Sequence, residues 1–377
     1  MAQDRRSQPR ALLALLLGTL IASASVAAQP LDGYDRAAYV ASVKAERAET
    51  DAEFRDPRTS PLDPRSRLLF ERLSYFPIDP AYRLAAEVEW IEEGEVVAML
   101  ATDSSTVDYR IAARLHFTLG GAPHTLTAYT LVETISDSLF VPFQDATTDH
   151  TTFNGGRSLS VPHPGTGAET ADLDFNKASN PSCAYSPVFP CVAVPPENVL
   201  SVGVEAGVRK PQQFLVDASD APLPETWLTV PVAESGYEVQ APFDMPFETV
   251  EYQGYPLHRA MVVVTPMAFI VFGAEFPFLG SATEEERNQI ADLALATMTG
   301  DAEVEVHERW IETLPSGRAI AVQGSSGGSP ITARTLILDS WIVMLAVLDL
   351  EVPGWEIETE EWTAVAQRFF ESLRRSE

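Results

Sequence analysis

The sequence predicts an α+β protein in two parts: a mainly antiparallel β barrel or sandwich, followed by an antiparallel sheet with flanking helices. Two observations predict this class. Over 83–208, short β-branched and aromatic runs are separated by Gly, Asp and Ser turns, which is typical of barrels and sandwiches of short antiparallel strands. After residue 226, such runs are interrupted by helical segments at 282–300 and 358–375, as in a sheet that packs against helices.

The chain begins with a predicted signal peptide at residues 1–28. Three Arg residues precede the apolar run ALLALLLGTLIASASV, and small residues lead to the expected cleavage position after Ala27 or Ala28. These are the parts of a secretory signal. The alternative is a membrane anchor, but the run is short for a span of roughly 20 residues. We therefore expect a secreted or periplasmic protein with no membrane insertion after signal removal.

The first part, 29–210, is predicted to open with a helix. The Ala- and charge-rich run 31–55 has helical spacing, DPRTSPLDP ends it, and SRLLFERL adds a short helical turn. Strand-like runs follow at 83–91, 95–102, 107–121, 122–134, 138–147, 154–163, 171–176 and 198–208. The Gly pair of LGGAPHTL marks a hairpin tip.

The polar, Pro-bearing segment 209–225 separates the parts, and the second part spans 226–377. Strand-like runs lie at 226–232, 237–242, 247–253, 258–265, 268–276, 303–313, 318–324, 332–339 and 341–350. Thr283 followed by acidic residues is a typical helix start. In the closing helix, apolar positions step by three or four and predict one buried face: Trp362, Val365, Phe369 and Leu373.

The charge of the chain excludes several classes of partner. Twenty-six basic residues stand against 54 acidic ones, a formal net charge of −28. Such a field repels nucleic acid and anionic lipid head groups, so we expect an unknown small molecule or protein as the partner. The acidic surface is either that of a protein exposed to high salt or a means of capturing a cationic ligand, which the sequence does not localise.

Cys183 and Cys191 are the two cysteines of the chain. In a secreted protein their oxidation to a disulfide is the expected state. A metal site and a redox pair are the alternatives. Structural zinc sites favour C-x₂₋₄-C spacing and four ligands, and no His lies beside this pair. We therefore expect a disulfide and neither a metal nor a cofactor.

Three runs of the first part carry a family resemblance: DATTDHTTFNGGRSL, LDFNKASNPSCAYSPVFPC and VPPENVL…VEAG. They resemble the run that ends a bacterial and archaeal domain-of-unknown-function family numbered 1684, and the resemblance covers about 35–208. Three positions depart from the family pattern, with Ser179 in place of Tyr, Val192 in place of Pro and Val208 in place of Glu. If that Glu were catalytic, this copy would be impaired. The resemblance implies positions to test, without a reaction.

The second part resembles, more loosely, the PsbP-like sandwich of a sheet with helices. The order of strands, helix, strands and a final R-F-F-x-S-L helix over 226–377 carries this resemblance. It implies an interaction or assembly module.

The family-like runs supply the candidate site residues: Asp145, Arg157, Asp174, Asn176, Asn180, Tyr185 and Asn198. In one interpretation they form a polar cluster at a binding mouth, with Tyr185 as an aromatic wall. In the other, Asp and Asn bond loop amides, and Arg157 pairs with an Asp as scaffold, since its planar fork matches a carboxylate. Asp145 could also join Asp149 and His150 at a cation.

Two further patterns suggest a site. GSSGG, with Ser326, matches the nucleophile-elbow spacing, but that motif needs a helix after it and the strand-like PITARTLIL follows. We expect a hairpin there. His116 and His124 flank the LGG turn and could face each other, although a His on a strand face is usually only half-buried.

The leading functional hypothesis is a secreted or periplasmic, non-enzymatic binding or assembly module. The alternative is a small-molecule enzyme that uses Asp145, Arg157, Asp174 and Asn176 at the mouth of the β domain. Acid–base chemistry there would need a carboxylate with a pKa raised by burial. Convergence of these side chains on one open pocket would favour the enzyme, and bonds into backbone amides would disfavour it.

Overall fold

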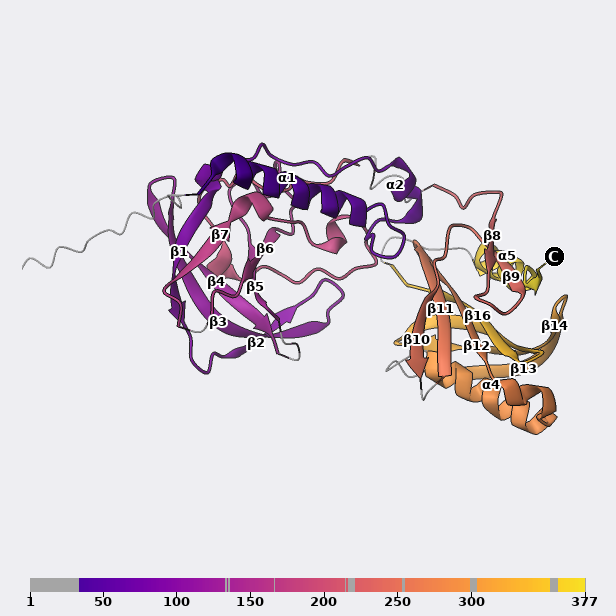
Figure 1. Cartoon of the computed structure of the whole chain (residues 1–377). Helices are drawn as coiled ribbons and strands as arrows, with labels where there is room; N and C mark the ends of the chain where they lie inside the picture. Colours follow the sequence, from indigo (N-terminus) through magenta and orange to yellow (C-terminus); the bar gives the residue numbers. More distant parts are fainter. Residues whose placement is uncertain are drawn as a thin grey trace, which may run out of the picture.

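The computed structural model describes residues 34–132, 134, 136–165, 167–213, 215, 221–252, 255–298, 304–352 and 359–376. The predicted signal peptide lies outside them, as do several residues of the segment 209–225. The described chain consists mainly of antiparallel sheets with few helices (Figure 1), which confirms the predicted class. None of its helices is long and apolar enough to span a bilayer.

The first sheet forms a nearly closed barrel. Its strands are β1 (Arg83–Trp90), β2 (Val96–Leu100), β3 (Thr106–Leu119), β4 (Ala122–Leu131), β5 (Ser138–Phe143), β6 (Arg157–Pro162) and β7 (Thr170–Asp174). They pair in the order β6-β5-β4-β3-β1-β7, β2 adds to β3, and β6 approaches β7. Alternation along the strands buries Leu115, Leu126, Leu139 and Leu173 completely in the interior.

Two helices precede this barrel, α1 (Arg36–Glu53) and α2 (Pro64–Leu69). The Asp35 carboxylate accepts hydrogen bonds from the amides of Ala37 and Ala38, which caps α1 at its N-terminus. Tyr39 and Val43 lie four residues apart on one face of α1 and are buried. Figure 1 shows α1 lying across the barrel.

The predicted strand at 198–208 is not a strand. Pro196–Asn198 is a 3₁₀ turn. The segment 199–208 that follows forms only single-residue bridges, from Val199 to Gln144 and from Val208 to Tyr75. Gly207 has a φ of 75°, and a side chain there would lie 2.6 Å from the carbonyl oxygen of Ala178. The close approach of backbone to backbone, rather than a sheet ladder, therefore accounts for the glycine.

The second sheet has seven antiparallel strands in the order β10-β11-β12-β16-β15-β14-β13. Their bounds are β10 (Glu248–Tyr252), β11 (Tyr255–Val264), β12 (Met267–Glu275), β13 (Val304–Leu314), β14 (Gly317–Ser326), β15 (Ser329–Leu338) and β16 (Trp341–Asp349). The turn between β14 and β15 is Gly327–Gly328, both with positive φ, so the GSSGG run is a hairpin as predicted.

Both faces of the second sheet are covered. On one side Ile342 and Met344 of β16 join a core that includes residues around α4 (Glu284–Met298). On the other, Val343 and Leu345 pack with α5 (Thr359–Glu371) and with a small sheet. The small sheet contains β8 (Leu228–Pro231), β9 (Tyr237–Ala241) and β17 (Arg374–Arg375). Burial on both faces explains the continuous apolar run of β16.

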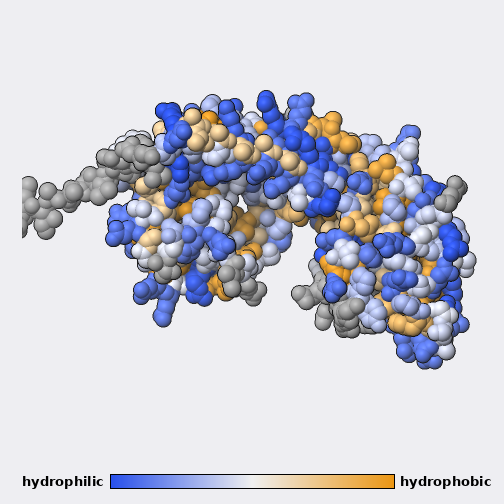
Figure 2. Space-filling model, in the orientation of Figure 1, coloured by the Kyte–Doolittle hydropathy of each residue, from blue (hydrophilic) through white to orange (hydrophobic). Residues whose placement is uncertain are grey.

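The helix α2 also contacts the second sheet. The buried Asp63 carboxylate accepts a hydrogen bond from the backbone amide of Thr265 at 2.9 Å, and Arg65 donates to the carbonyl of the same residue at 2.9 Å. Asp63 and Arg65 also pair with each other at 2.8 Å. Figure 2 shows hydrophilic residues over much of the visible face of both parts, as the charge of the chain leads one to expect.

Candidate functional site

Asp145 and Arg157 form a buried ion pair. Arg157 donates to Asp145 at 2.8 Å, and its guanidinium also donates to the carbonyls of Val204, Ala206 and Val208. Burial lowers the pKa of Arg157, and the Asp145 carboxylate opposes that shift. The two terminal nitrogens of the guanidinium therefore fasten 204–208 to the barrel, whereas its Nε is buried without a partner among the described residues.

The remaining oxygen of Asp145 is also occupied by the protein. It accepts from the amide and the hydroxyl of Thr147, at 2.7 and 2.6 Å, and from the amide of Val204 at 3.1 Å. These hydrogen bonds hold the 145–147 turn and the segment that begins at Val204 together. In the described chain, Asp145, Asp149 and His150 do not belong to a group of three or more His, Cys, Asp or Glu residues that could hold a metal ion.

Asp174 and Asn176 form a second network, which holds α1 on the barrel. The Tyr39 hydroxyl donates to the Asp174 carboxylate at 2.9 Å, and the Asn176 amide nitrogen lies 2.9 Å from the Tyr39 oxygen. Asn176 also exchanges hydrogen bonds with the backbone of Asp79 in both directions. Burial raises the pKa of Asp174, although its hydrogen bonds to Tyr39 and Asn176 lower it.

Asn198 is a backbone clamp. Its side-chain oxygen accepts from the Thr127 amide at 2.7 Å, and its side-chain nitrogen donates to the carbonyls of Thr127 and Pro142 at 2.8 and 2.7 Å. Asn198 is fully buried. It therefore joins β4 to β5, where only Tyr129 and Phe140 pair directly.

Asn180 and Tyr185 line a small cavity under α1, together with Asn176. The Asn180 amide donates to the Tyr185 hydroxyl at 3.1 Å and to the carbonyl of Arg209 at 2.9 Å. The cavity has a volume of about 110 Å³. The side-chain oxygen of Asn180 (Oδ1) and the Nε of Arg47 are buried without a partner in the described chain. This space therefore suits water or a ligand of a few atoms.

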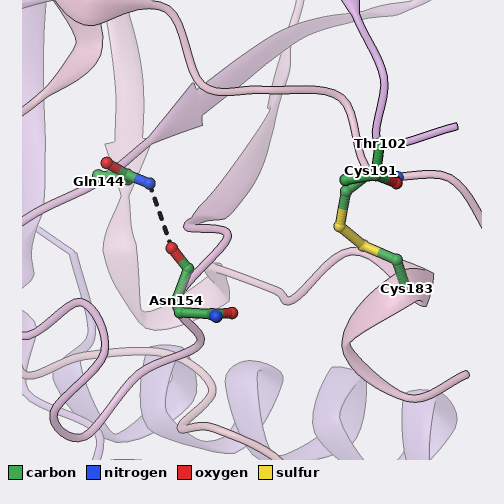
Figure 3. The surroundings of a disulfide bond; sticks show 5 residues. All are labelled: Thr102, Gln144, Asn154, Cys183 and Cys191. Carbon is green, nitrogen blue, oxygen red and sulfur yellow. Dashed lines mark hydrogen bonds between the residues drawn. A yellow bond between two sulfur atoms is a disulfide. The ribbon is translucent and has the colours of Figure 1, made fainter. Parts of the chain in front are cut away.

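A disulfide joins Cys183 to Cys191, as predicted (Figure 3). Cys191 also pairs with the end of β2, since its amide donates to the Thr102 hydroxyl and its carbonyl accepts from the Thr102 amide, both at 2.9 Å. Tyr185, in the loop that the disulfide closes, packs edge-on against Phe54 at 4.8 Å between ring centres. The disulfide therefore links β2 to the loop that packs against the end of α1.

The two strand histidines do not face each other. His116 is paired with Thr125 and His124 with Phe117 in adjacent positions of the hairpin, so their side chains lie on opposite faces. His116 contacts Glu89 at 3.0 Å, and His124 lies near the ring of Phe117.

A larger hollow in the second part, which we call the α5 groove, was not predicted from the sequence. It lies between α5 and strands β13–β15, with a volume of about 630 Å³, and an adjoining hollow has about 360 Å³. Its walls include Trp310, Phe370 and Trp362, with Arg334 and Glu312 between them. The two hollows share Glu308, Gln323 and Trp362.

The spacing of apolar residues in α5 is the sequence feature from which this groove could have been predicted. The predicted apolar face is largely correct, because Phe369 and Leu373 are buried. Trp362, at the start of the same face, is only half-buried and lines the groove. An incompletely buried Trp on a core-facing stripe indicates that the helix does not cover the sheet at that end.

Comparison with known proteins identifies the first part. Residues 69–209 match the family described as protein of unknown function (DUF1684). The chain is 38% identical to an uncharacterized protein of Haloarcula marismortui, over 46% of this chain and 95% of that one, with a TM-score of 0.40. The chain belongs to the DUF1684 family. The residues from Asp145 to Asn198 lie inside the DUF1684 match, whereas α1 and the α5 groove lie outside it.

Other matches are distant. The solution structure of PsbP from Synechocystis sp. PCC 6803 matches at 10% identity over 39% of this chain and 91% of that one, with a TM-score of 0.29. MucB in its complex with MucA matches at 11% identity over 90% of this chain and 99% of that one, with a TM-score of 0.19. No curated protein matches the chain.

Proposed function

We propose that this DUF1684 protein is a non-enzymatic, extracytoplasmic binding protein whose ligand occupies the α5 groove. The size and lining of the groove support this function. Small-molecule sites are typically clefts of about 300–1,000 Å³ with aromatic walls and a few polar groups. The hollows of about 630 and 360 Å³ fall in that range, and they combine two Trp rings with Arg334 and Gln323.

The polar residues of the first part favour binding over catalysis. Asp145 and Arg157 satisfy backbone groups of one loop, and Asp174 satisfies Tyr39 and Asn176 in another network. A general acid or base must reach a proton of the substrate, and these side chains do not converge on one open pocket. The enzymatic alternative therefore has no geometric support in these residues.

An extracytoplasmic location is compatible with the disulfide, because disulfides persist in oxidising compartments. The predicted signal peptide supports the same location. Expression of the full chain with its own leader tests it directly. We expect the mature protein in the periplasm or medium, with an N-terminus that begins after Ala27 or Ala28, and a retained leader would contradict the proposal.

A thermal-shift screen tests the groove. The mature protein is heated with a library of small cationic, neutral and anionic compounds, since a ligand that binds only the folded state raises the midpoint. A hit should lose its effect in Thr363→Trp, which places a large ring at the groove wall. Ala364→Trp is the matched control, because Ala364 is exposed on the same helix and does not line the groove.

The pair of variants separates a groove ligand from other binding. Loss of the shift in Thr363→Trp with retention in Ala364→Trp supports the proposal. Equal shifts in both variants would place the ligand elsewhere and contradict it. A library without any hit against the wild-type protein would also count against a small-molecule site.

A further inference from the structure

The α5 groove already holds one cation of its own. The Arg334 guanidinium lies 4.9 Å from the centre of the Trp310 ring and 4.7 Å from that of Phe370, and it pairs with Glu312. Both partners of this ion pair are largely removed from solvent, with 12% and 27% of their side chains exposed. An aromatic face and a carboxylate together therefore stabilise a half-buried cation in this groove.

The same two kinds of group, an aromatic ring and a carboxylate, also line the part of the groove that the two hollows share. Trp362 and Glu308 line both hollows. No cation stacks on the Trp362 ring, and no ion pair engages Glu308, among the residues that the structure describes. The Trp362 Nε1 is buried there and has no acceptor.

The residues that line the two hollows carry more negative than positive charge. Among the described residues that line the two hollows are two Arg residues, Arg309 and Arg334, and four acidic residues: Glu308, Glu312, Glu371 and Asp349. The chain as a whole carries a net charge of −28. This field raises the local concentration of cations and lowers that of anions.

We infer that the α5 groove selects a ligand that carries an organic cation, held between the Trp362 ring and the Glu308 carboxylate, with a hydroxyl or carbonyl acceptor nearby for the Trp362 N–H. The inference rests on the proposed function of the groove and adds the chemical class of the ligand. Quaternary ammonium groups suit such a site, because the ring attracts the charge and the methyl groups fill apolar space.

Choline and 3,3-dimethyl-1-butanol are matched probes, since they have the same shape and hydroxyl group and differ by a nitrogen cation in place of a carbon. Isothermal titration of the mature protein with each should show binding of choline and binding of the neutral alcohol weaker by about tenfold, in line with cation–π energies of about 1–2 kcal/mol. The anion 3,3-dimethylbutyrate should not bind. Equal affinity for the alcohol and choline would overturn the inference.

Two substitutions locate the cation. Glu308→Gln should weaken choline binding several-fold, and folding is not at risk because Glu308 is exposed. Glu49→Gln is the control, since it changes the net charge equally at an exposed position of α1. If the two substitutions weaken choline binding equally, Glu308 acts only through the net charge of the protein, and its direct contact with the cation is overturned.

The inference and the proposed function fail in different ways. If the library gives a neutral or anionic ligand that Thr363→Trp abolishes, while choline does not bind, the groove is a binding site and the cationic class is wrong. If neither the library nor the three probes bind, the proposed function itself is contradicted.

Discussion

The carboxylate of Asp145 lies 2.8 Å from the guanidinium of Arg157, with 1% of each side chain exposed. This pair has the composition of a catalytic or substrate-binding clamp. Its remaining hydrogen bonds all go to the segment 204–208 and to Thr147. The two side chains therefore replace the strand pairing that the segment lacks.

Removal of one partner of this pair should destabilise the fold strongly. Arg157→Met leaves one oxygen of the buried Asp145 carboxylate and three backbone carbonyls without their Arg157 donor, and we expect a loss of about 3–5 kcal/mol in the free energy of unfolding. Urea denaturation measures it. The exposed pair of Lys177 and Glu46, 2.7 Å apart, is the control, and Lys177→Met should cost no more than about 1 kcal/mol. Similar losses in both variants would contradict the scaffold role.

Asn198→Ala should cost about 3 kcal/mol or more of unfolding free energy. The substitution leaves the amide and carbonyl of Thr127 and the carbonyl of Pro142 buried without partners, and each such group costs about 1–3 kcal/mol. Asn154→Ala is the matched control, because Asn154 is exposed and contributes only its backbone carbonyl, to Gln144 (Figure 3). An Asn198→Ala protein as stable as the control would show that the clamp is dispensable.

The stability of the Asp174 network should depend on pH. Burial raises the pKa of Asp174 from its ordinary value of 3.8, so the folded state holds this proton more tightly than the unfolded state does. Its contribution to stability is therefore complete below pH 3.8 and falls as the pH rises through the raised pKa. A carboxyl NMR titration should place the Asp174 pKa above 3.8.

Tyr39→Phe tests the same dependence of stability on pH, because it removes the hydroxyl that donates to Asp174. The Tyr39 hydroxyl donates to Asp174 and lowers its pKa, so its removal raises that pKa further. The variant should lose about 1–3 kcal/mol at pH 7 and less at a pH below 3.8, where the carboxyl is neutral in both states. Tyr34→Phe, which removes the hydroxyl of the neighbouring ring, is the control. A Tyr39→Phe loss that is independent of pH would contradict an ionised Asp174.

The disulfide should stabilise the protein modestly. Replacement of both Cys183 and Cys191 by Ala reopens a short loop, for which chain entropy predicts a loss of about 2–3 kcal/mol. Denaturation with and without a reducing agent gives the same comparison in the wild-type protein. A free thiol detected in the native, unreduced protein would contradict the bridge.

Much of the fold could be predicted because its signals are local. Every predicted strand of the second part is present, and the LGG and GSSGG turns are hairpin tips as expected. The segment 198–208 was wrongly predicted as a strand. Its apolar alternation is real, since Leu200, Val204 and Ala206 are buried. Scattered backbone hydrogen bonds, such as those to Gln144, and the side chains of Asp145 and Arg157 satisfy its backbone in place of a strand ladder.

The roles of the site residues were predictable only as alternatives. The sequence indicated that Asp145, Arg157, Asp174 and Asn176 matter together and left open whether they hold a ligand or the loops. The partners that decide this are remote, because Arg157 bonds carbonyls 47 to 51 residues away and Asp174 bonds a tyrosine 135 residues away. No local sequence pattern predicts contacts between residues that lie so far apart along the chain.

The sequence by itself determined the strands, the amphipathic helices, the acidic charge, the pairing of Cys183 with Cys191 and the DUF1684 membership, since each depends on neighbours along the chain or on composition. Only the tertiary structure decided that the polar family residues are bonded to remote backbone and side-chain groups and that an aromatic groove opens beside α5. A hydrogen bond or a hollow depends on which remote surfaces meet, and Trp310 and Trp362 line one groove only because the sheet and its closing helix fold together.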